Sequence, residues 1–179
     1  MSKPEHKNNL NGCNYAIHKL IFGLFFSLFI SLKLLAQDGR IWATYYGASA
    51  QEGGFTVTTD PAGNVYMAGI TASQSGMASG GFQNTFGGGN VDAYLVKFDS
   101  SGARLWATYY GGAGDEMSFF GGKMGVAADD SGNVYLAGLT NSTTGIAANG
   151  FQNTIGGTVN AYLAKFGPAG NRIWATYYG

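Results

Sequence analysis

Carboxylates are the side chains best placed for chemistry in this sequence of 179 residues. Glu52 and Glu116 lie 64 residues apart at equivalent positions of an internal repeat, and Asp115 precedes Glu116. Two carboxyl groups can share acid and base catalysis in a glycosidase without a histidine. A catalytic pair is normally unique to one pocket, however, whereas residues that recur in each repeat are expected to be structural. The sequence therefore predicts no enzyme, and we assign no catalytic, ligand-binding, cofactor or metal residue.

The only histidines and the only cysteine, His6, His18 and Cys13, precede an apolar run from Leu20 to Leu32. Basic residues before such a run and a small residue after it, here Ala36, are typical of a signal peptide. We expect residues 1–36 to form a helical signal peptide that is cleaved, leaving no stable membrane span. An uncleaved anchor is the alternative, although a spanning helix needs about 20 apolar residues. The mature chain would then lack His and Cys, which excludes a Cys nucleophile, a Ser-His-Asp triad, a typical zinc site and disulfides.

The composition of the remaining chain suits an all-β domain. The whole chain carries ten basic and ten acidic residues, but six bases and nine acids follow residue 36. A mildly acidic body argues against a nucleic-acid groove, which needs clustered Lys and Arg. The 30 glycines and the 15% of aromatic residues indicate many short strands joined by tight turns.

An internal repeat organises the chain after the apolar run. WATYYG occurs three times, at residues 42–47, 106–111 and 174–179. Other motifs occur twice in the same order: GNVYMAGIT and GNVYLAGLT, GFQNT, and DAYLVKF and NAYLAKF. Motifs that recur in the same order predict tandem copies of one structural unit. We assign residues 37–179 to the repeats, with repeat 1 at about 48–111, repeat 2 at about 112–179 and an orphan strand at 40–47; five extra residues fall near 119–123.

Each repeat is expected to form four strands. In the first they lie near 54–59, 64–71, 91–98 and 104–110, and in the second near 122–128, 133–140, 159–166 and 172–178. The turns that begin at Asp60, Asp99, Asp129 and Gly167 share one plan, in which the fourth residue is a glycine suited to positive φ. The aspartates can accept bonds from backbone N–H groups of the turn, which favours a structural role over metal binding. A calcium role stays an open alternative, with Asp92 replaced by Asn160 in the second copy.

Both faces of the predicted strands carry bulky residues. In the segment 40–46, Ile41, Ala43 and Tyr45 alternate with Trp42, Thr44 and Tyr46. Sheets with two apolar faces need burial on both sides, which similar sheets can provide. The predicted fold is therefore all-β, with tandem four-stranded antiparallel blades of the β-propeller type. The small pairs Ala68-Gly69 and Ala137-Gly138 are expected where strands or sheets approach closely.

The motifs GNVYLAG, FQNT, DAYLVKF and WATYYGG resemble the SBBP β-propeller repeat family of bacterial exported proteins. The resemblance covers essentially all of residues 38–179. It implies a propeller, usually with more repeats than are present here, and implies little about chemistry. Two blades cannot close a propeller, which typically has four to eight. The chain is therefore expected to be a fragment, or else several two-blade chains assemble into one ring with the orphan strand completing a neighbour's blade. Unpaired blade edges predict a sticky or poorly stable monomer.

The favoured function is an exported structural or binding module, secreted, periplasmic or on the cell surface, for an unknown protein or glycan. Its binding residues would lie in the long loops Ala72–Asn90 and Asn141–Thr158. Phe82 and Phe151 are expected to be the hydrophobic residues that anchor these loops. A lectin formed by oligomerised two-blade chains is the alternative. Its sugar-stacking residues would be drawn from Trp42, Trp106, Trp174 and the paired tyrosines, which are more simply explained as packing residues. A glycosidase-like hydrolase is the weaker alternative.

Overall fold

The computed structural model describes Gly39, residues 41–116 and residues 124–179. The predicted signal peptide, with His6, Cys13 and His18, lies outside these residues, as do the extra residues 119–123. Within the described ranges, no long apolar helix that could span a membrane is found. Both sheets of the structure belong to the unit Trp42–Gly179.

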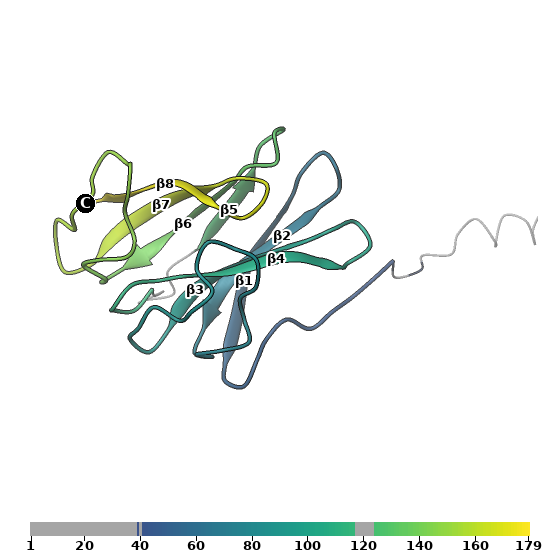
Figure 1. Cartoon of the computed structure of the whole chain (residues 1–179), viewed down its shortest axis with the longest axis horizontal. Coiled ribbons are helices and arrows are strands. Elements are labelled where there is room, and N and C mark those ends of the chain that lie inside the picture. Colours follow the sequence, from purple (N-terminus) through teal and green to yellow (C-terminus); the bar gives the residue numbers. More distant parts are fainter. Residues whose placement is uncertain (1–38, 40, 117–123) are drawn as a thin grey trace, which may run out of the picture. The chain divides into compact units, whose positions relative to one another are not determined.

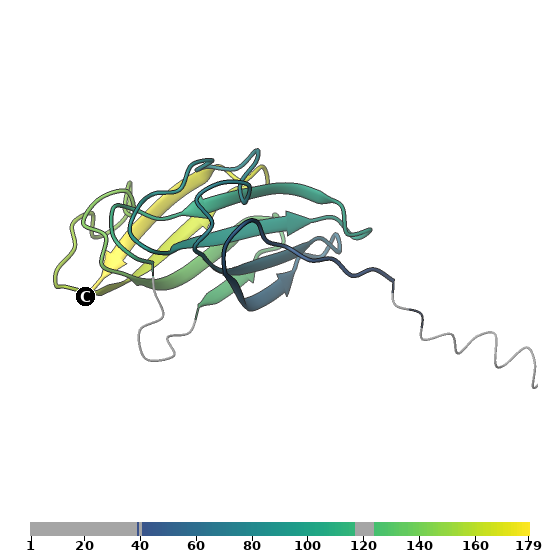
Figure 2. The same cartoon turned by 90° about the horizontal axis from the view of Figure 1, so that it is seen from below.

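The described residues are all-β, as predicted, and form two four-stranded antiparallel sheets (Figure 1). Blade 1 contains β1 (Glu52–Thr59), β2 (Val65–Thr71), β3 (Asp92–Phe98) and β4 (Arg104–Tyr110). Blade 2 contains β5 (Gly125–Ala128), β6 (Val134–Thr140), β7 (Asn160–Phe166) and β8 (Arg172–Tyr178). In each sheet the strands are hydrogen-bonded in chain order, so that each blade is a meander, and Figure 2 shows the same strands from below.

The tight turns follow the predicted plan. Gly63, Gly102, Gly132 and Gly170 all have positive φ, between 73° and 88°. In the first turn the Gly63 N–H donates to Asp60 O at 2.9 Å, while Asp60 Oδ1 accepts from the Asn64 N–H at 2.9 Å. The same bonds recur at Asp129, and they fix the hairpin register through protein groups alone.

Burial on both faces distinguishes the middle strands. Every residue of β3 is buried, and a single apolar cluster joins blade 1 side chains such as Tyr66 and Leu95 to blade 2 side chains such as Leu136 and Phe166. Glycine permits the close approach of strands that was predicted at Gly69, where a Cβ would overlap the Gly53 carbonyl. The first strands of the two blades, β1 and β5, also contact each other. The two sheets therefore pack face to face, as neighbouring blades of a propeller do.

The long loops cap the outer edge of each sheet. Between β2 and β3, Ser79 exchanges two backbone hydrogen bonds with Ala107 of β4, each 2.9 Å long, and the Tyr109 N–H donates to Gln83 O at 2.9 Å. Ala148 and Ala175 exchange the equivalent bonds in blade 2. The outer strands β4 and β8 thus have backbone partners on both sides along part of their length, which differs from the unpaired outer edges expected from sequence.

The segment predicted as an orphan strand, residues 40–47, does not form a strand where it is described, from Ile41 to Gly47. No described strand pairs with its backbone, so side chains alone position it. Tyr46 packs at 5.5 Å from Tyr94 and 5.8 Å from Phe98, measured between ring centroids, and its hydroxyl donates to Met77 O. The segment therefore rests on one face of blade 1 without extending its sheet.

Candidate functional site

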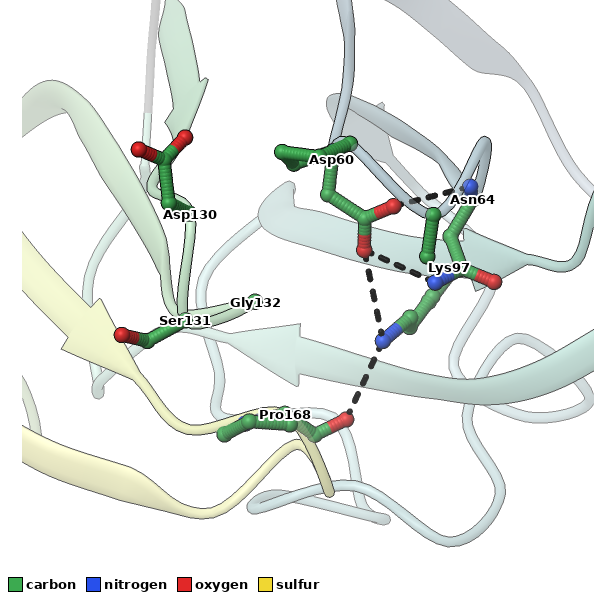
Figure 3. Close-up of a pocket in the computed structure, with 9 residues that line it drawn as sticks. Asp60, Asn64, Lys97, Asp130, Ser131, Gly132 and Pro168 are labelled. Carbon is green, nitrogen blue, oxygen red and sulfur yellow. Dashed lines mark hydrogen bonds and ion pairs between the residues drawn. The ribbon is translucent and has the colours of Figure 1, made fainter.

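Polar residues gather at both ends of the junction between the two blades. The turn-side cluster lies where the β1–β2 turn of blade 1 meets the β5–β6 and β7–β8 turns of blade 2. Asp60 accepts hydrogen bonds from the Asn64 side chain at 2.8 Å and from the Tyr66 hydroxyl at 3.0 Å. Lys97 approaches the same carboxylate at 3.9 Å and places its ammonium 5.0 Å from the centre of the Tyr66 ring. Figure 3 shows Asp60, Asn64 and Lys97 on one wall of a small pocket.

Electrostatics keep Asp60 ionised. Burial disfavours its charge, but hydrogen bonds from the side chain and backbone of Asn64 and from Tyr66 outweigh burial and lower its pKa. Burial, together with the negative charge of the neighbouring Asp60, raises the pKa of the Tyr66 hydroxyl. The equivalent groups of blade 2, Asp129 and Lys165, lie 4.0 Å apart and are more exposed. Because the arrangement recurs in each repeat, its first role is to stabilise the blade.

Blade 2 closes the cluster with backbone carbonyls. The Trp106 indole N–H donates to Pro168 O at 2.9 Å, and the Tyr66 hydroxyl also lies 3.2 Å from Gly132 O. Lys97 Nζ reaches Pro168 O at 3.5 Å, the contact drawn in Figure 3. These bonds run from the side chains of one blade to the turns of the next. They fix the angle between the blades at this end of the junction.

The pocket at this cluster has a volume of about 250 Å³ and is lined by Asp60, Pro61, Ala62, Asn64, Lys97, Asp130, Ser131, Gly132 and Pro168. It is smaller than the roughly 300–1,000 Å³ of usual ligand pockets. Asp130 and Ser131 stand across from Lys97 and make no drawn contact with it (Figure 3). Ser131 donates its backbone N–H to Asp129 Oδ1 at 3.0 Å, and its hydroxyl makes no hydrogen bond to a base among the described residues. The groups present can hydrogen-bond a small polar molecule but offer no evident catalytic set.

At the opposite end of the strands, each blade contains one of the two recurring glutamates. Glu52 accepts from Thr71 Oγ1 at 2.9 Å, from Ser73 Oγ at 2.5 Å and from the Ala48 N–H at 3.2 Å. Each glutamate thus ties the segment after one WATYYG motif to the end of the second strand of the following blade.

Glu116 repeats this pattern. It accepts from Thr140 Oγ1 at 2.7 Å, from Ser142 Oγ at 2.6 Å and from the Gly112 N–H at 3.1 Å. The predicted equivalence of Glu52 and Glu116 is therefore confirmed at the level of individual hydrogen bonds. This connection between blades explains why a glutamate recurs there.

A third carboxylate, Asp92, lies against Glu116. A Cβ on Gly111 would overlap both Asp92 Oδ1 and Glu116 Oε2, so these two oxygens occupy the same small space. Asp92 Oδ2 accepts from the Gly87 N–H at 2.6 Å, whereas the buried Oδ1 has no hydrogen-bond partner among the described residues. Burial raises the pKa of Asp92 to about 6, and burial together with the nearby Asp92 charge raises the pKa of Glu116 to about 7. One proton shared by the pair would relieve the repulsion.

The equivalent residue of blade 2 shows which hydrogen bond Asp92 Oδ1 lacks. Asn160 occupies the position of Asp92, and its Oδ1 accepts from the Gly157 N–H at 3.0 Å. Its amide nitrogen donates to Gly179 O at 3.1 Å. Asp92 Oδ1 takes the place of that amide donor and can donate only when it is protonated. The exchange of Asp for Asn was visible in the sequence, but its proximity to Glu116 was not.

Other residues singled out from sequence have structural surroundings. Asp115 Oδ1 accepts from the Asn90 N–H at 2.5 Å, so this carboxylate is bonded within the loop region. The predicted anchors Phe82 and Phe151 are 40% and 91% exposed, and this prediction is wrong. The loop residues that fill the core are instead Met77 and Ile146, because the loops turn these side chains inward as they run along β4 and β8.

The tryptophans pack between blades or against neighbouring rings. Trp106 is buried and lies 6.2 Å from the Tyr66 ring, Trp42 lies 6.0 Å from Phe98, and Trp174 lies 6.4 Å from Tyr135. Because Trp106 is only 4% exposed, it offers no open face for stacking on a sugar, and its indole N–H donates to Pro168 O. Among the described residues, no group of three or more His, Cys, Asp or Glu side chains is arranged to hold a metal ion.

Comparison with known proteins supports the repeat architecture. The chain is 31% identical over 104 residues to an uncharacterized WD repeat-containing protein, L264, of Acanthamoeba polyphaga mimivirus. The match covers 48% of this chain but only 8% of the viral protein. No protein-family model matches the chain, so the resemblance to the SBBP family stays a prediction. What is supported is a repeat of the β-propeller type.

Proposed function

We propose that this chain is an exported, non-enzymatic module of the β-propeller type that serves as a scaffold or binding surface. The observation that carries the proposal is the structural use of the recurring polar residues. Glu52 and Glu116 each tie the segment that precedes a blade to the second strand of that blade, and Asp60 and Asp129 close turns. Each does so with equivalent partners in both repeats. Groups that are engaged in this way, once in each repeat, build a frame and leave function to the loops and exposed faces.

Stability and activity measurements on two variants of Glu116 test this proposal. Glu116→Ala would leave the Thr140 and Ser142 hydroxyls without their acceptor, and buried unsatisfied groups cost about 1–3 kcal/mol each. We expect the variant to unfold at lower urea concentration, and we expect neither protein to hydrolyse a panel of aryl glycosides. Glycoside turnover that Glu116→Gln abolishes, with an unchanged unfolding midpoint, would contradict a structural role.

Export is proposed on the basis of the predicted signal peptide and needs a separate measurement. Expression of the whole chain in a bacterium, followed by mass spectrometry of the protein outside the cytoplasm, would define its first residue. We expect cleavage after Ala36, so that Gln37 begins the exported chain. An intact N-terminus on membrane-bound protein would instead favour the anchor.

The partner of such a module is proposed to be a protein or a glycan that meets the loops along the outer strands of the blades. The loop residues Phe82 and Phe151 are exposed there, and the Arg172 guanidinium lies 4.3 Å from the centre of the Phe82 ring. Exposed aromatic and arginine side chains are enriched at protein interfaces. A pull-down with the wild-type protein and with a Phe82→Ser, Phe151→Ser variant as the control would identify a partner that depends on these loops.

A further inference from the structure

The junction between the two blades defines two complementary faces. We call the face of blade 1 that covers blade 2 the exit face, and the face of blade 2 that receives it the entry face. The exit face is built from Tyr66, Ala68, Ala93, Leu95, Trp106 and Tyr110, all of which are buried. The entry face includes Val134, Leu136, Ile146, Tyr162, Ala164 and Phe166, which are also buried.

The exit face of blade 2 has the same residues without a cover. Its members are Tyr135, Ala137, Ala161, Leu163, Trp174 and Tyr178, which match the exit face of blade 1 type for type. None of them is buried, and Leu163 and Tyr178 are 36% and 73% exposed where Leu95 and Tyr110 are fully buried. Blade 2 therefore presents an exposed apolar surface. In the junction within the molecule, the equivalent surface of blade 1 is covered by an entry face.

Blade 1 carries an entry face that is only half covered. Tyr94 and Phe98 are buried there under the segment Trp42–Gly47. Val65 and Met67 are partly exposed, whereas their counterparts in blade 2, Val134 and Leu136, are fully buried beneath blade 1. The segment Trp42–Gly47 thus covers the part of this face that the outer strand of a neighbouring blade would cover. The part that the inner strands of such a blade would cover stays exposed.

The segment Trp42–Gly47 reproduces the packing of an outer strand. Tyr46 packs on Tyr94 and Phe98 and donates to Met77 O. In the blade 1–blade 2 junction, Tyr110 packs on Tyr162 at 5.3 Å and on Phe166 at 5.4 Å, and donates to Ile146 O at 2.6 Å. Tyr46 therefore makes the same contacts with blade 1 that Tyr110 makes with blade 2.

Trp42 likewise takes the place that Trp106 has in the junction. A Cβ on Gly102 would lie 2.8 Å from the Trp42 indole, and a Cβ on Gly170 would lie 2.8 Å from that of Trp106. Residues 41–47 and 173–179 are both IWATYYG. The segment that rests on blade 1 is therefore identical in sequence to β8, the outer strand of the uncovered exit face.

We propose that the exit face of blade 2 docks onto the entry face of blade 1 of a second copy, and that the segment Trp42–Gly47 is a placeholder that β8 displaces. The two cannot occupy the entry face together, because they would fill the same positions. The incoming IWATYYG segment packs on the same side chains as the outgoing one, and docking also buries Val65, Met67, Tyr135 and Leu163. The association is head-to-tail, so it produces either a closed ring or an open series of copies.

This proposal rests on the propeller-type module proposed above, and identical substitutions in the two identical segments test it. Purified wild-type protein, Trp42→Ala and Trp174→Ala are compared by sedimentation equilibrium over a range of concentrations. We expect wild type to associate, Trp174→Ala to weaken association about tenfold or more, as truncation of a central aromatic anchor does, and Trp42→Ala to strengthen it. Tyr46→Phe and Tyr178→Phe form a milder pair, each removing one hydroxyl, with the same opposite directions expected.

Failure of the docking proposal can be distinguished from failure of the proposed β-propeller-type module. Far-UV circular dichroism and a cooperative thermal transition report whether the blades have folded. A folded wild-type protein that keeps the mass of one chain at every concentration would overturn the docking proposal and leave the module intact. Equal weakening by Trp42→Ala and Trp174→Ala would overturn the placeholder role. Loss of the sheet signal in wild type would overturn the module and the docking together.

Discussion

Replacement of Asp92 by asparagine is expected to stabilise the protein above pH 7. The amide of Asn160 donates to Gly179 O at the twin position, whereas Asp92 Oδ1 is buried beside Glu116 with no hydrogen-bond partner in the described part of the chain. An amide at residue 92 would supply a donor and remove one of two buried negative charges. A pKa raised from 3.8 to about 6 corresponds to about 3 kcal/mol between the two protonation states. Burial of the charged carboxylate is the largest cause of this shift, and an amide carries no charge, so we expect a gain of about 1–3 kcal/mol in the free energy of unfolding at pH 8.

The sign of the pH dependence follows from the raised pKa values. The folded protein holds protons on Asp92 and Glu116 at pH values where the unfolded chain has released them. The contribution to stability is therefore fully present below about pH 4 and is lost as the pH rises through about 6 to 7. The negative charge of Asp115 also raises the pKa of Asp92, whereas Glu52 and Asp60 have lowered pKa values and titrate below this range.

Urea unfolding followed by tryptophan fluorescence, at pH 5 and at pH 8, measures this effect. Wild type should lose stability between the two pH values, and Asp92→Asn should match wild type at pH 5 and exceed it at pH 8. Asn160→Asp is the mirror control and should lose stability at pH 8, because a carboxylate would replace the donor to Gly179 O. A wild type that is equally stable at both pH values, or an Asp92→Asn variant that is weaker than wild type at both, would refute the reasoning.

The remaining predictions concern packing and metal binding. Met77→Ala should cost about 2–5 kcal/mol in unfolding free energy, as for other buried large-to-small changes, whereas Phe151→Ala at an exposed site should change it by less than about 0.5 kcal/mol, both measured by urea unfolding. Gly69→Ala should lower the melting temperature by several degrees because its Cβ would overlap Gly53 O, whereas Gly125→Ala, with its nearest atom 3.9 Å away, should not; an equal effect would contradict the strand register. Addition of a chelator should leave the melting temperature unchanged, because hydrogen bonds and not a metal ion hold the recurring carboxylates; a fall in the melting temperature would favour the calcium alternative.

The strands and turns could be predicted from sequence because their causes are local. A glycine with positive φ, three residues after Asp or Gly, fixes each hairpin, so observed strand ends differ from the predicted ones by about three residues or fewer. Such turn chemistry acts within a few residues and does not depend on the rest of the fold. The recurrence of Trp106 and the paired tyrosines in each repeat likewise identified them as packing residues.

The meeting of side chains across the junction could not be predicted in the same way. Asp92 and Glu116 were both noted in the sequence, but their proximity depends on how β3 of one blade reaches the start of the next. The choice between Phe82 and Met77 as the loop anchor depends on the path of the loop along β4, which sequence alternation does not encode. Residues 41–47 have the pattern of a strand, yet a strand needs a neighbour, and the described chain provides none beside them.

The capping of the outer strands directs how the molecule can grow. Ser79 and Gln83 occupy backbone groups of β4, and Ala148 and Gln152 do the same for β8, so these edges cannot readily recruit another strand. Addition of sheet to sheet in the manner of an amyloid is thereby discouraged at the outer rim. Apolar surface remains on the broad sides of the blades instead, at residues such as Leu163 and Tyr178. The loops therefore oppose edge-to-edge growth of the sheets at the outer strands and leave face-to-face stacking of blades as the open direction of assembly.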